Sequence, residues 1–329
     1  MLQPRLPKEA KLMNRIQGIH HITAMASDPQ KNVDFYTDVL GQRFVKKTVN
    51  FDDPGTYHLY YGDLVGSPGT IMTFFPFQHA ARGKRGNGEV LASAYGIHPD
   101  SIDWWKARFR SLDINYTTET RFGEEVITIA DPDDMQIELI ANGGDPAPTH
   151  WADGPIPEEH ALRAFHGVTI GVHEAAPTAA LLVGVFGYEL AGEEGDRVRY
   201  QAAGGFGQYV DLLVRPGYAR GRMGAGSVHH VAFRTVDDSE QLEYQAALRE
   251  AGGMVTDVKD RQYFHSIYMR EPNGTLFEVA TDAPGFPYDE PVETLGEALK
   301  LPSWLEPMRG KIEGILPEIR LKYSSESVS

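Results

Sequence analysis

The chain has 329 residues, 41% of them hydrophobic and 23% charged, an ordinary globular balance with room for one large or two medium domains. Its 31 basic and 46 acidic residues give a net charge of −15, which argues against binding nucleic acid or anionic membranes. The absence of cysteine excludes disulfides, Cys-ligated zinc, iron–sulfur clusters and a thiol nucleophile. Residues 1–18 contain no apolar signal-peptide core, and no apolar stretch could span a bilayer, so we expect a cytoplasmic protein.

One pattern recurs four times along the chain: a short β-like run, a polar turn, a helical segment and further β-like runs. A repeat of roughly 55–75 residues indicates an internal-repeat architecture. We therefore expect an α+β fold of four βαβββ modules. The opening runs and helical segments are Ile19–Met25 with Asn32–Leu40, Val90–Ile97 with Ser101–Leu112, Phe165–Ile170 with Pro177–Phe186, and Val228–Phe233 with Ser239–Ala251.

The closing strands of the second and fourth modules share a pattern. Residues 131–138 (DPDDMQIE) align without a gap on residues 271–278 (EPNGTLFE). Their Pro, Asp, Asn and Gly residues mark a turn before each strand. Residues 69–73 and 207–211 occupy the same place in the first and third modules.

A segment rich in Pro, Gly and Asp, Gly143–Pro157, marks a linker between two halves. We predict an N-terminal domain at 1–145, a linker at 146–162, a C-terminal domain at 163–290 and a helical tail at 291–329. Apolar side chains from Leu301 onward predict that the tail packs on the body, and Pro317 interrupts its helix. The four modules are placed at about 16–80, 88–142, 163–216 and 226–282.

Adjacent histidines open two modules, as His20-His21 and His229-His230. Neighbouring residues on a strand point to opposite faces, so we expect only one His of each pair to face a given cavity. In the fourth module His230 shares a small, open face with Ala232. His229 shares the bulky apolar face that fits against a helix.

The same alternation places Glu278, in the apolar last strand, on the concave face with His21 and His230. A buried carboxylate is costly unless it is paired or bound to metal. Two imidazoles and one carboxylate with open positions form the facial triad of non-haem Fe(II) oxygen chemistry. We therefore predict one Fe(II) ion on these three residues, for which Mn, Ni, Zn or Co can substitute. The alternative is that the histidines only fill the sheet interior.

The repeat register distinguishes between ways of pairing the modules. At the equivalent position of the closing strands the four modules carry, in order, Thr73, Glu138, Asp211 and Glu278. If modules one and four pair, one cavity holds both histidines and Glu278, with Thr73 at a fourth place. If modules one and two pair, the histidines are split between incomplete sites. We interpret Glu138 and Asp211 as partners of nearby Arg or Lys.

Three segments resemble the vicinal oxygen chelate superfamily, which includes glyoxalase I, bleomycin-resistance proteins and type I extradiol dioxygenases. They are residues 18–23 (GIHHIT), Phe35–Gly41 and residues 271–278. Further matches resemble the hydroquinone ring-cleaving 1,2-dioxygenases, and the likeness runs from about Ile16 to Pro287. These matches are residues 41–48 (GQRFVKKT), 57–60 (YHLY), 66–70 (GSPGT), 120–123 (TRFG) and His229-His230.

The resemblance implies two vicinal-oxygen-chelate domains with curved mixed sheets around a metal cavity, and a metal site built from modules one and four. It implies that Fe(II) is held by His21, His230 and Glu278. It also implies roles near the substrate or metal for Thr23, Arg261, Tyr268, His20 and His229. Without it, Arg261 and Tyr268 would be interpreted as ordinary surface or strand residues.

The predicted reaction is ring cleavage of a hydroquinone-type aromatic by O2, and assembly into a homo-oligomer stays open. A glyoxalase-type lyase or isomerase is the first alternative, disfavoured because Thr73 replaces the fourth ligand that such enzymes need. A non-catalytic binding protein is the second, disfavoured by the four modules and the complete triad. A catechol-type extradiol dioxygenase would use modules three and four, where Gly167 replaces the histidine.

Overall fold

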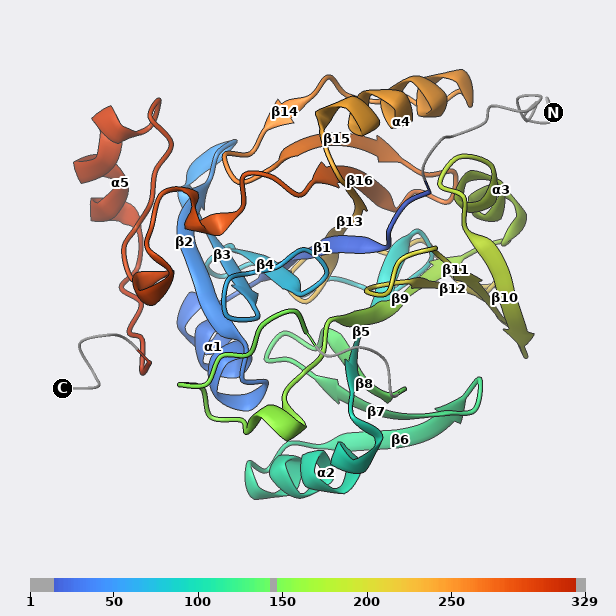
Figure 1. Ribbon diagram of the computed structural model, residues 1–329, viewed down its shortest axis with the longest axis horizontal. Coiled ribbons are helices and arrows are strands. Elements are labelled where there is room, and N and C mark those ends of the chain that lie inside the picture. The colour runs from blue at the N-terminus through green and yellow to red at the C-terminus, as the bar shows by residue number, and fades with distance from the viewer. Residues whose placement is uncertain (1–14, 143–146, 324–329) are drawn as a thin grey trace.

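The computed structural model describes residues 15–142 and 147–323. They form two eight-stranded mixed sheets with few helices, so the predicted α+β class is confirmed (Figure 1). Parts of the predicted N-terminal domain, at 1–14 and 143–145, of the linker, at 146, and of the tail, at 324–329, lie outside the described residues. None of the helices within the described ranges is long and apolar enough to cross a bilayer.

The first sheet unites modules one and four, in the order β14-β15-β16-β13-β1-β4-β3-β2. The central pair, β1 and β13, is antiparallel, and each of these strands has a parallel neighbour on its other side. The repeat register had favoured this pairing, and the sheet order confirms it. The strands are β1 (Ile19–Ala26), β2 (Arg43–Asn50), β3 (Asp53–Gly62), β4 (Ile71–Pro76), β13 (Val228–Thr235), β14 (Lys259–Asp260), β15 (His265–Arg270) and β16 (Leu276–Thr281).

The second sheet unites modules two and three in the equivalent order, β10-β11-β12-β9-β5-β8-β7-β6. Each sheet thus takes one module from each half of the chain, and the predicted domain boundaries, which follow the sequence halves, stay a prediction. The strands are β5 (Glu89–Ile97), β6 (Tyr116–Arg121), β7 (Glu124–Ala130), β8 (Gln136–Ala141), β9 (Phe165–Val172), β10 (Glu189–Glu194), β11 (Arg197–Gln201) and β12 (Tyr209–Val214).

One helix follows the first strand of each module, and polar caps start two of them. Asp28 accepts hydrogen bonds from the backbone of Gln30 and Lys31, and Asp237 accepts one from Glu240. The helices are α1 (Pro29–Asp34), continued by a π-helical turn (Phe35–Val39), α2 (Ile102–Ser111), α3 (Ala176–Gly184), α4 (Asp238–Glu250) and α5 (Arg309–Ile315). Short 3-10 turns lie at Pro99–Ser101, Glu158–His160, Phe286–Tyr288, Val292–Thr294 and Glu306–Met308.

The aligned turns before β8 and β16 are built in the same way. One carboxylate oxygen of Asp131 accepts the backbone N–H groups of Asp133 and Met135, at 2.8 Å each. Glu271 accepts those of Asn273 and Thr275, at 3.0 and 2.8 Å. An acidic side chain that satisfies two backbone donors fixes the direction in which the closing strand begins.

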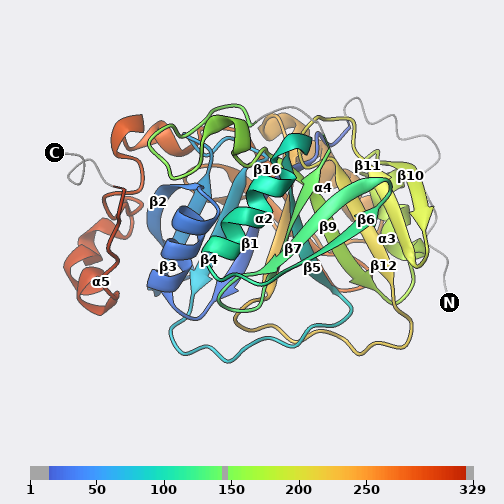
Figure 2. The ribbon, with the colours of Figure 1, turned by 90° about the horizontal axis from the view of Figure 1, so that it is seen from below.

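Two crossover segments, 77–88 and 215–227, join the sheets and run side by side at the lower edge of Figure 2. Backbone hydrogen bonds connect them, from Gly83 to Ala225 at 3.0 Å and from Lys84 to Arg222 at 2.8 Å. The two sheets are therefore linked by paired segments as well as by the core between them.

The tail packs on the body of the protein, as the sequence predicts, and it does so against β2. Leu301, Leu305 and Ile312 form a buried apolar cluster with Val49. The N–H of Lys300 donates to the carbonyl of Lys47 at 2.9 Å. Within the described part of the tail, residues 291–323, the regular structure consists of the short helix α5 and two 3-10 turns, and the segment runs beside β2 (Figure 1).

Candidate metal centre

Three side chains converge on the concave face of the first sheet. His21 lies on β1, His230 on β13 and Glu278 on β16, and these three strands are adjacent. Nε2 of His230 is 2.9 Å from Oε2 of Glu278, Nε2 of His21 is 3.4 Å from the same oxygen, and the two Nε2 atoms are 3.3 Å apart. Within residues 15–142 and 147–323, this is the one group of three or more His, Asp or Glu residues close enough to hold an ion.

The electrostatics of the three residues fit a divalent cation. Burial opposes ionisation of Glu278, but the two adjacent imidazoles hold the pKa of its carboxyl well below the ordinary value. Burial lowers the pKa of His230, which keeps its imidazole in the neutral form that binds metal. Ser266 donates a short hydrogen bond to Oε1 of Glu278. Oε2 is buried without a well-aligned hydrogen bond of its own, as expected of an oxygen reserved for a metal.

In each pair, the histidine that is not a predicted ligand is placed by a β-bulge. His20 is an extra residue on β1, and His229 is an extra residue on β13. Nδ1 of His20 lies 2.9 Å from Nδ1 of His21, and Nδ1 of His229 lies 2.8 Å from Nδ1 of His230. Both are thus next to the predicted ligands, and their supporting role stays a prediction.

The bulge at His229 makes one expectation wrong. Strict alternation placed this residue with Val231 and Phe233 against a helix. Those two residues do belong to the main core, but His229 lines the same cavity as His21 and His230. A bulge breaks the two-residue period of a strand, so both histidines of the pair can face one side.

The triad opens into a cavity of about 580 Å³. Arg261 and Tyr268 both line it, as the resemblance implied. Nε of Arg261 donates to the Tyr268 hydroxyl at 3.0 Å, and Nη1 donates to Asp52 at 3.1 Å. Burial disfavours the charged guanidinium, but Tyr268, Asp52 and Glu278 outweigh it and raise the pKa of Arg261. The cavity therefore has a permanent positive charge close to the triad.

Thr23 is fully buried and is not among the residues that line the cavity, and its role near the substrate or metal stays a prediction. It pairs across the sheet with His230 on one side and Thr73 on the other, and its hydroxyl accepts a hydrogen bond from Thr73 at 3.2 Å. The hydroxyl of Thr73, which stands where the repeat register would put a fourth metal ligand, thus has a hydrogen-bond partner within the protein.

The sequence analysis assigned no role to His58, which also lines the cavity. Its Nε2 is 2.6 Å from Oγ1 of Thr73, and its Nδ1 is 2.8 Å from the hydroxyl of Tyr60. A single histidine in a strand carries no signal of its own. The available clues were the match at residues 57–60, which assigns no role to the histidine, and its place two residues before Tyr60, hence on the same face of β3.

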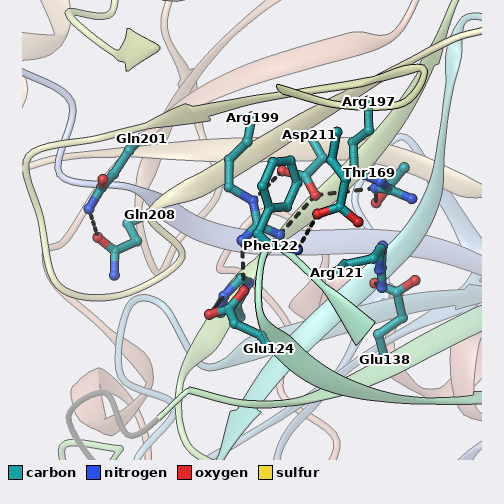
Figure 3. Close-up of polar contacts among 12 residues, drawn as sticks. Arg121, Phe122, Glu124, Glu138, Thr169, Arg197, Arg199, Gln201, Gln208 and Asp211 are labelled. Carbon is teal, nitrogen blue, oxygen red and sulfur yellow. Dashed lines mark hydrogen bonds and ion pairs between the residues drawn. The ribbon is translucent and has the colours of Figure 1, made fainter. Parts of the chain in front are cut away.

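In the second sheet, ion pairs occupy the equivalent place (Figure 3). Glu138 pairs with Arg121 at 2.7 Å, and Asp211 pairs with Arg199 at 2.8 Å, which confirms that arginines partner these carboxylates. At Gly167 a Cβ atom would lie 2.3 Å from the carbonyl oxygen of Tyr209, so the backbone leaves no space for a histidine there.

Comparisons with known proteins show the family of the chain. Residues 18–139 and 164–279 match the family described as the Glyoxalase/Bleomycin resistance protein/Dioxygenase superfamily. "Putative ring-cleaving dioxygenase MhqO" of Bacillus subtilis is 46% identical over 94% of this chain and 99% of its own length. "Chlorohydroquinone/hydroquinone 1,2-dioxygenase" of Sphingobium indicum is 34% identical over 92% of this chain and 96% of its own.

Solved structures show the same fold. A "putative dioxygenase" from Bacillus subtilis superposes with a TM-score of 0.90 and 45% identity, over 93% of this chain and 98% of that one. Glyoxalase I from Zea mays has a TM-score of 0.60 at 15% identity, over 80% of this chain and 92% of that one. At this identity the similarity concerns the fold and not the activity. From the matched residues and the near-complete coverage of its relatives, the chain belongs to the glyoxalase/bleomycin resistance/dioxygenase superfamily.

Proposed function

We propose that the protein is an Fe(II)-dependent dioxygenase that cleaves the ring of a hydroquinone-type aromatic with O2. The observation that carries the proposal is the buried group of His21, His230 and Glu278 at the base of a cavity, with Thr73 in place of a fourth ligand. Two relatives over almost the whole chain carry the names of ring-cleaving and hydroquinone dioxygenases, which supports the same reaction class.

The residues present fit a metal with open positions. Iron bound to one carboxylate and two imidazoles would supply adjacent sites at which substrate and O2 are activated together. The protein contributes the orientation of those ligands. Ser266 fixes Glu278, and His20 and His229 contact Nδ1 of the two ligand histidines, which leaves both Nε2 atoms directed into the cavity.

Arg261 and Tyr268 would act on the substrate oxygen. The guanidinium of Arg261 is a fixed positive charge in a mostly buried position, and it also orients the hydroxyl of Tyr268. Tyr268 pairs across the sheet with Glu278, so its ring stands beside the triad, 5.8 Å from the ring of His230. A preorganised cation and hydroxyl stabilise an ionised phenolic oxygen and the negative charge that develops during ring attack.

Apolar side chains would hold the ring itself. Phe75, Phe264 and Leu276 line the cavity around the polar groups. Phe264 lies against His21, with 4.8 Å between ring centroids. Such walls bind an aromatic ring and limit the access of water to the site.

A glyoxalase-type lyase is the competing function for this fold. It needs a fourth protein ligand, and at that place the Thr73 hydroxyl is engaged with His58 and Thr23. This arrangement favours the dioxygenase. A protein that gains isomerase or lyase activity with Ni, Zn or Co, and consumes no oxygen with Fe(II), would support the lyase instead.

The test is anaerobic reconstitution with Fe(II), followed by oxygen-electrode assays with hydroquinones and catechols. We expect oxygen uptake with hydroquinones, and loss of both iron retention and oxygen uptake in Glu278→Gln and His230→Ala. Glu138→Gln is the matched control, because it changes the equivalent carboxylate in the other sheet and should keep both properties. Full oxygen uptake by Glu278→Gln would overturn the assignment.

A further inference from the structure

His58 lies between two aromatic rings in the wall of the cavity. Its ring centroid is 4.1 Å from that of Tyr60 and 4.2 Å from that of Phe75. The hydroxyl of Tyr60 bonds Nδ1, which leaves Nε2 as the polar atom at the other edge of the ring. The imidazole therefore packs against two rings and is hydrogen-bonded to Tyr60 at Nδ1, while Nε2 can change its partner.

The position of β3 relates His58 to the triad. β3 is the second strand from β1, with β4 between them. Neighbouring strands are about 4.8 Å apart, so the backbones of β1 and β3 are separated by roughly 10 Å across the concave face. The register places His58 beside Phe75, in the row of Met25, and its Nε2 reaches back to Thr73, in the row of Thr23. His58 and the ligand His21 line the same cavity from these two strands. Phe75, on the intervening strand β4, also lines this cavity.

Polar groups at two separate places in one cavity suit a para-diol better than an ortho-diol. When one oxygen of hydroquinone lies at the triad, the second hydroxyl is at the opposite end of the ring. A catechol carries its second hydroxyl beside the first, and hence at the triad. A polar group across the cavity from the ligands can therefore contact the distal oxygen of a hydroquinone but not that of a catechol.

His58 can exchange its hydrogen bond with Thr73 for one with a ligand, because Thr73 has a second partner. Nε2 now lies 2.6 Å from Oγ1 of Thr73, and that hydroxyl also bonds Thr23. If His58 turns to a ligand, Thr73 keeps Thr23 as its partner. Burial, with contributions from His21, His230 and Arg261, lowers the pKa of His58 well below its usual value, so the ring is neutral and can bond a phenol without an ion pair.

We propose that His58 determines specificity for para-diols, by a hydrogen bond between its Nε2 and the distal hydroxyl of the substrate in place of Thr73. The inference rests on the proposed function for one point only, that the ring is held at the triad through one oxygen. It names the feature of the substrate that this wall of the cavity recognises.

The test measures binding without turnover. The Zn(II)-loaded protein is titrated anaerobically with hydroquinone and with 4-methylphenol, which has the same shape but no distal hydroxyl. A hydrogen bond of ordinary strength predicts that hydroquinone binds about three- to tenfold more tightly. In His58→Phe this ratio should fall to about one, with little change in the affinity for 4-methylphenol. In Thr73→Val the ratio should stay or rise, because the competing partner of Nε2 is removed.

Two outcomes would overturn the inference. One is a His58→Phe protein with the wild-type ratio, and the other is an equal loss of affinity for both phenols, which would mean that the residue only shapes the cavity. If His58→Phe does not fold, His58→Gln replaces it in the test. Because Gln keeps a polar group, this variant should still bind hydroquinone more tightly than 4-methylphenol, by a smaller ratio than the wild type. Oxygen uptake by the Fe(II)-loaded wild type reports the proposed function separately, so a failure of catalysis with an intact binding ratio would reject that function alone.

Discussion

Nδ1 of His229 lies 2.8 Å from Nδ1 of His230, and the pair His20 and His21 repeats this contact at 2.9 Å. A hydrogen bond between two ring nitrogens needs a proton on one of them, so each outer histidine fixes the tautomer and the ring orientation of its neighbour. Burial lowers the pKa of His229 to about 3, which keeps this partner neutral at ordinary pH.

The first prediction concerns this outer contact. His229→Leu removes the partner of a metal ligand and should weaken metal binding about 10- to 100-fold, the range found for such neighbours of metal ligands. His229→Gln can still bond the ring of His230 and should lose less. Metal affinity is measured by competition with a chromogenic chelator. Equal affinities for wild type and His229→Leu would show that the outer histidine does not orient its neighbour.

The second prediction separates substrate activation from metal binding. Arg261→Met removes the positive charge beside Tyr268 and should lower kcat about 100- to 1000-fold with iron content unchanged, the magnitude found when one charge-stabilising donor is lost. Arg234→Met is the control, since Arg234 pairs with Asp282 in the same sheet and is not part of the cavity lining. Iron-normalised oxygen uptake is the measurement. A variant as active as the control would remove Arg261 from the mechanism.

The third prediction concerns Asp131, whose pKa is raised to about 6 by burial. The folded state then holds this proton more tightly than the unfolded state, whose carboxyl has a pKa near 3.9. Stability from this group is therefore greatest at low pH and is lost as pH rises from about 4 to 6, by at most about 3 kcal/mol. Asp131→Asn should flatten this part of the profile. Denaturant unfolding at a series of pH values measures it, and an unchanged slope in the variant would contradict the assignment.

The fourth prediction concerns a buried lysine. Nζ of Lys46 has no exposed surface and lies 2.6 Å from both Asp289 and Glu290, which anchors the segment after β16 to β2. Lys46→Met would leave two carboxylates without their cation and should lower the free energy of unfolding by about 3–5 kcal/mol. Lys106→Met, in the more exposed pair with Glu125, should cost less than about 1 kcal/mol. Chemical denaturation of both variants gives the comparison.

The sequence alone predicted the positions of those site residues that recur at a regular spacing along a strand or between repeats. Alternation along the strands and the register of four repeats together brought His21, His230 and Glu278 to one face, because both depend only on spacing. The same register found Thr73, Glu138 and Asp211, and the arginine partners of the last two follow from the cost of a buried carboxylate.

Other residues could not be predicted from spacing. The bulge at His229 adds one residue to a strand and reverses the side to which a side chain points, and no residue type in the segment marks it. The first helix changes to a π-helical turn at Phe35, within a segment expected to be one regular helix. Arg261 lies outside the strands, where no period exists, and its place near the site was suggested only by resemblance. His58 depends on contacts with three other residues that no local pattern shows.

The central pairing of β1 with β13 has a consequence for biosynthesis. The two strands are about 200 residues apart in the chain, and the strand of Glu278 follows later still. At about 5–20 residues per second, a ribosome makes β1 on the order of ten to fifty seconds before β16. For most of that interval β1 has neither its partner strand β13 nor the other two ligand residues, and Glu278 is the last of the three to be made. The nascent chain therefore cannot assemble the triad, and metal can enter this site only after nearly the whole protein has been synthesised.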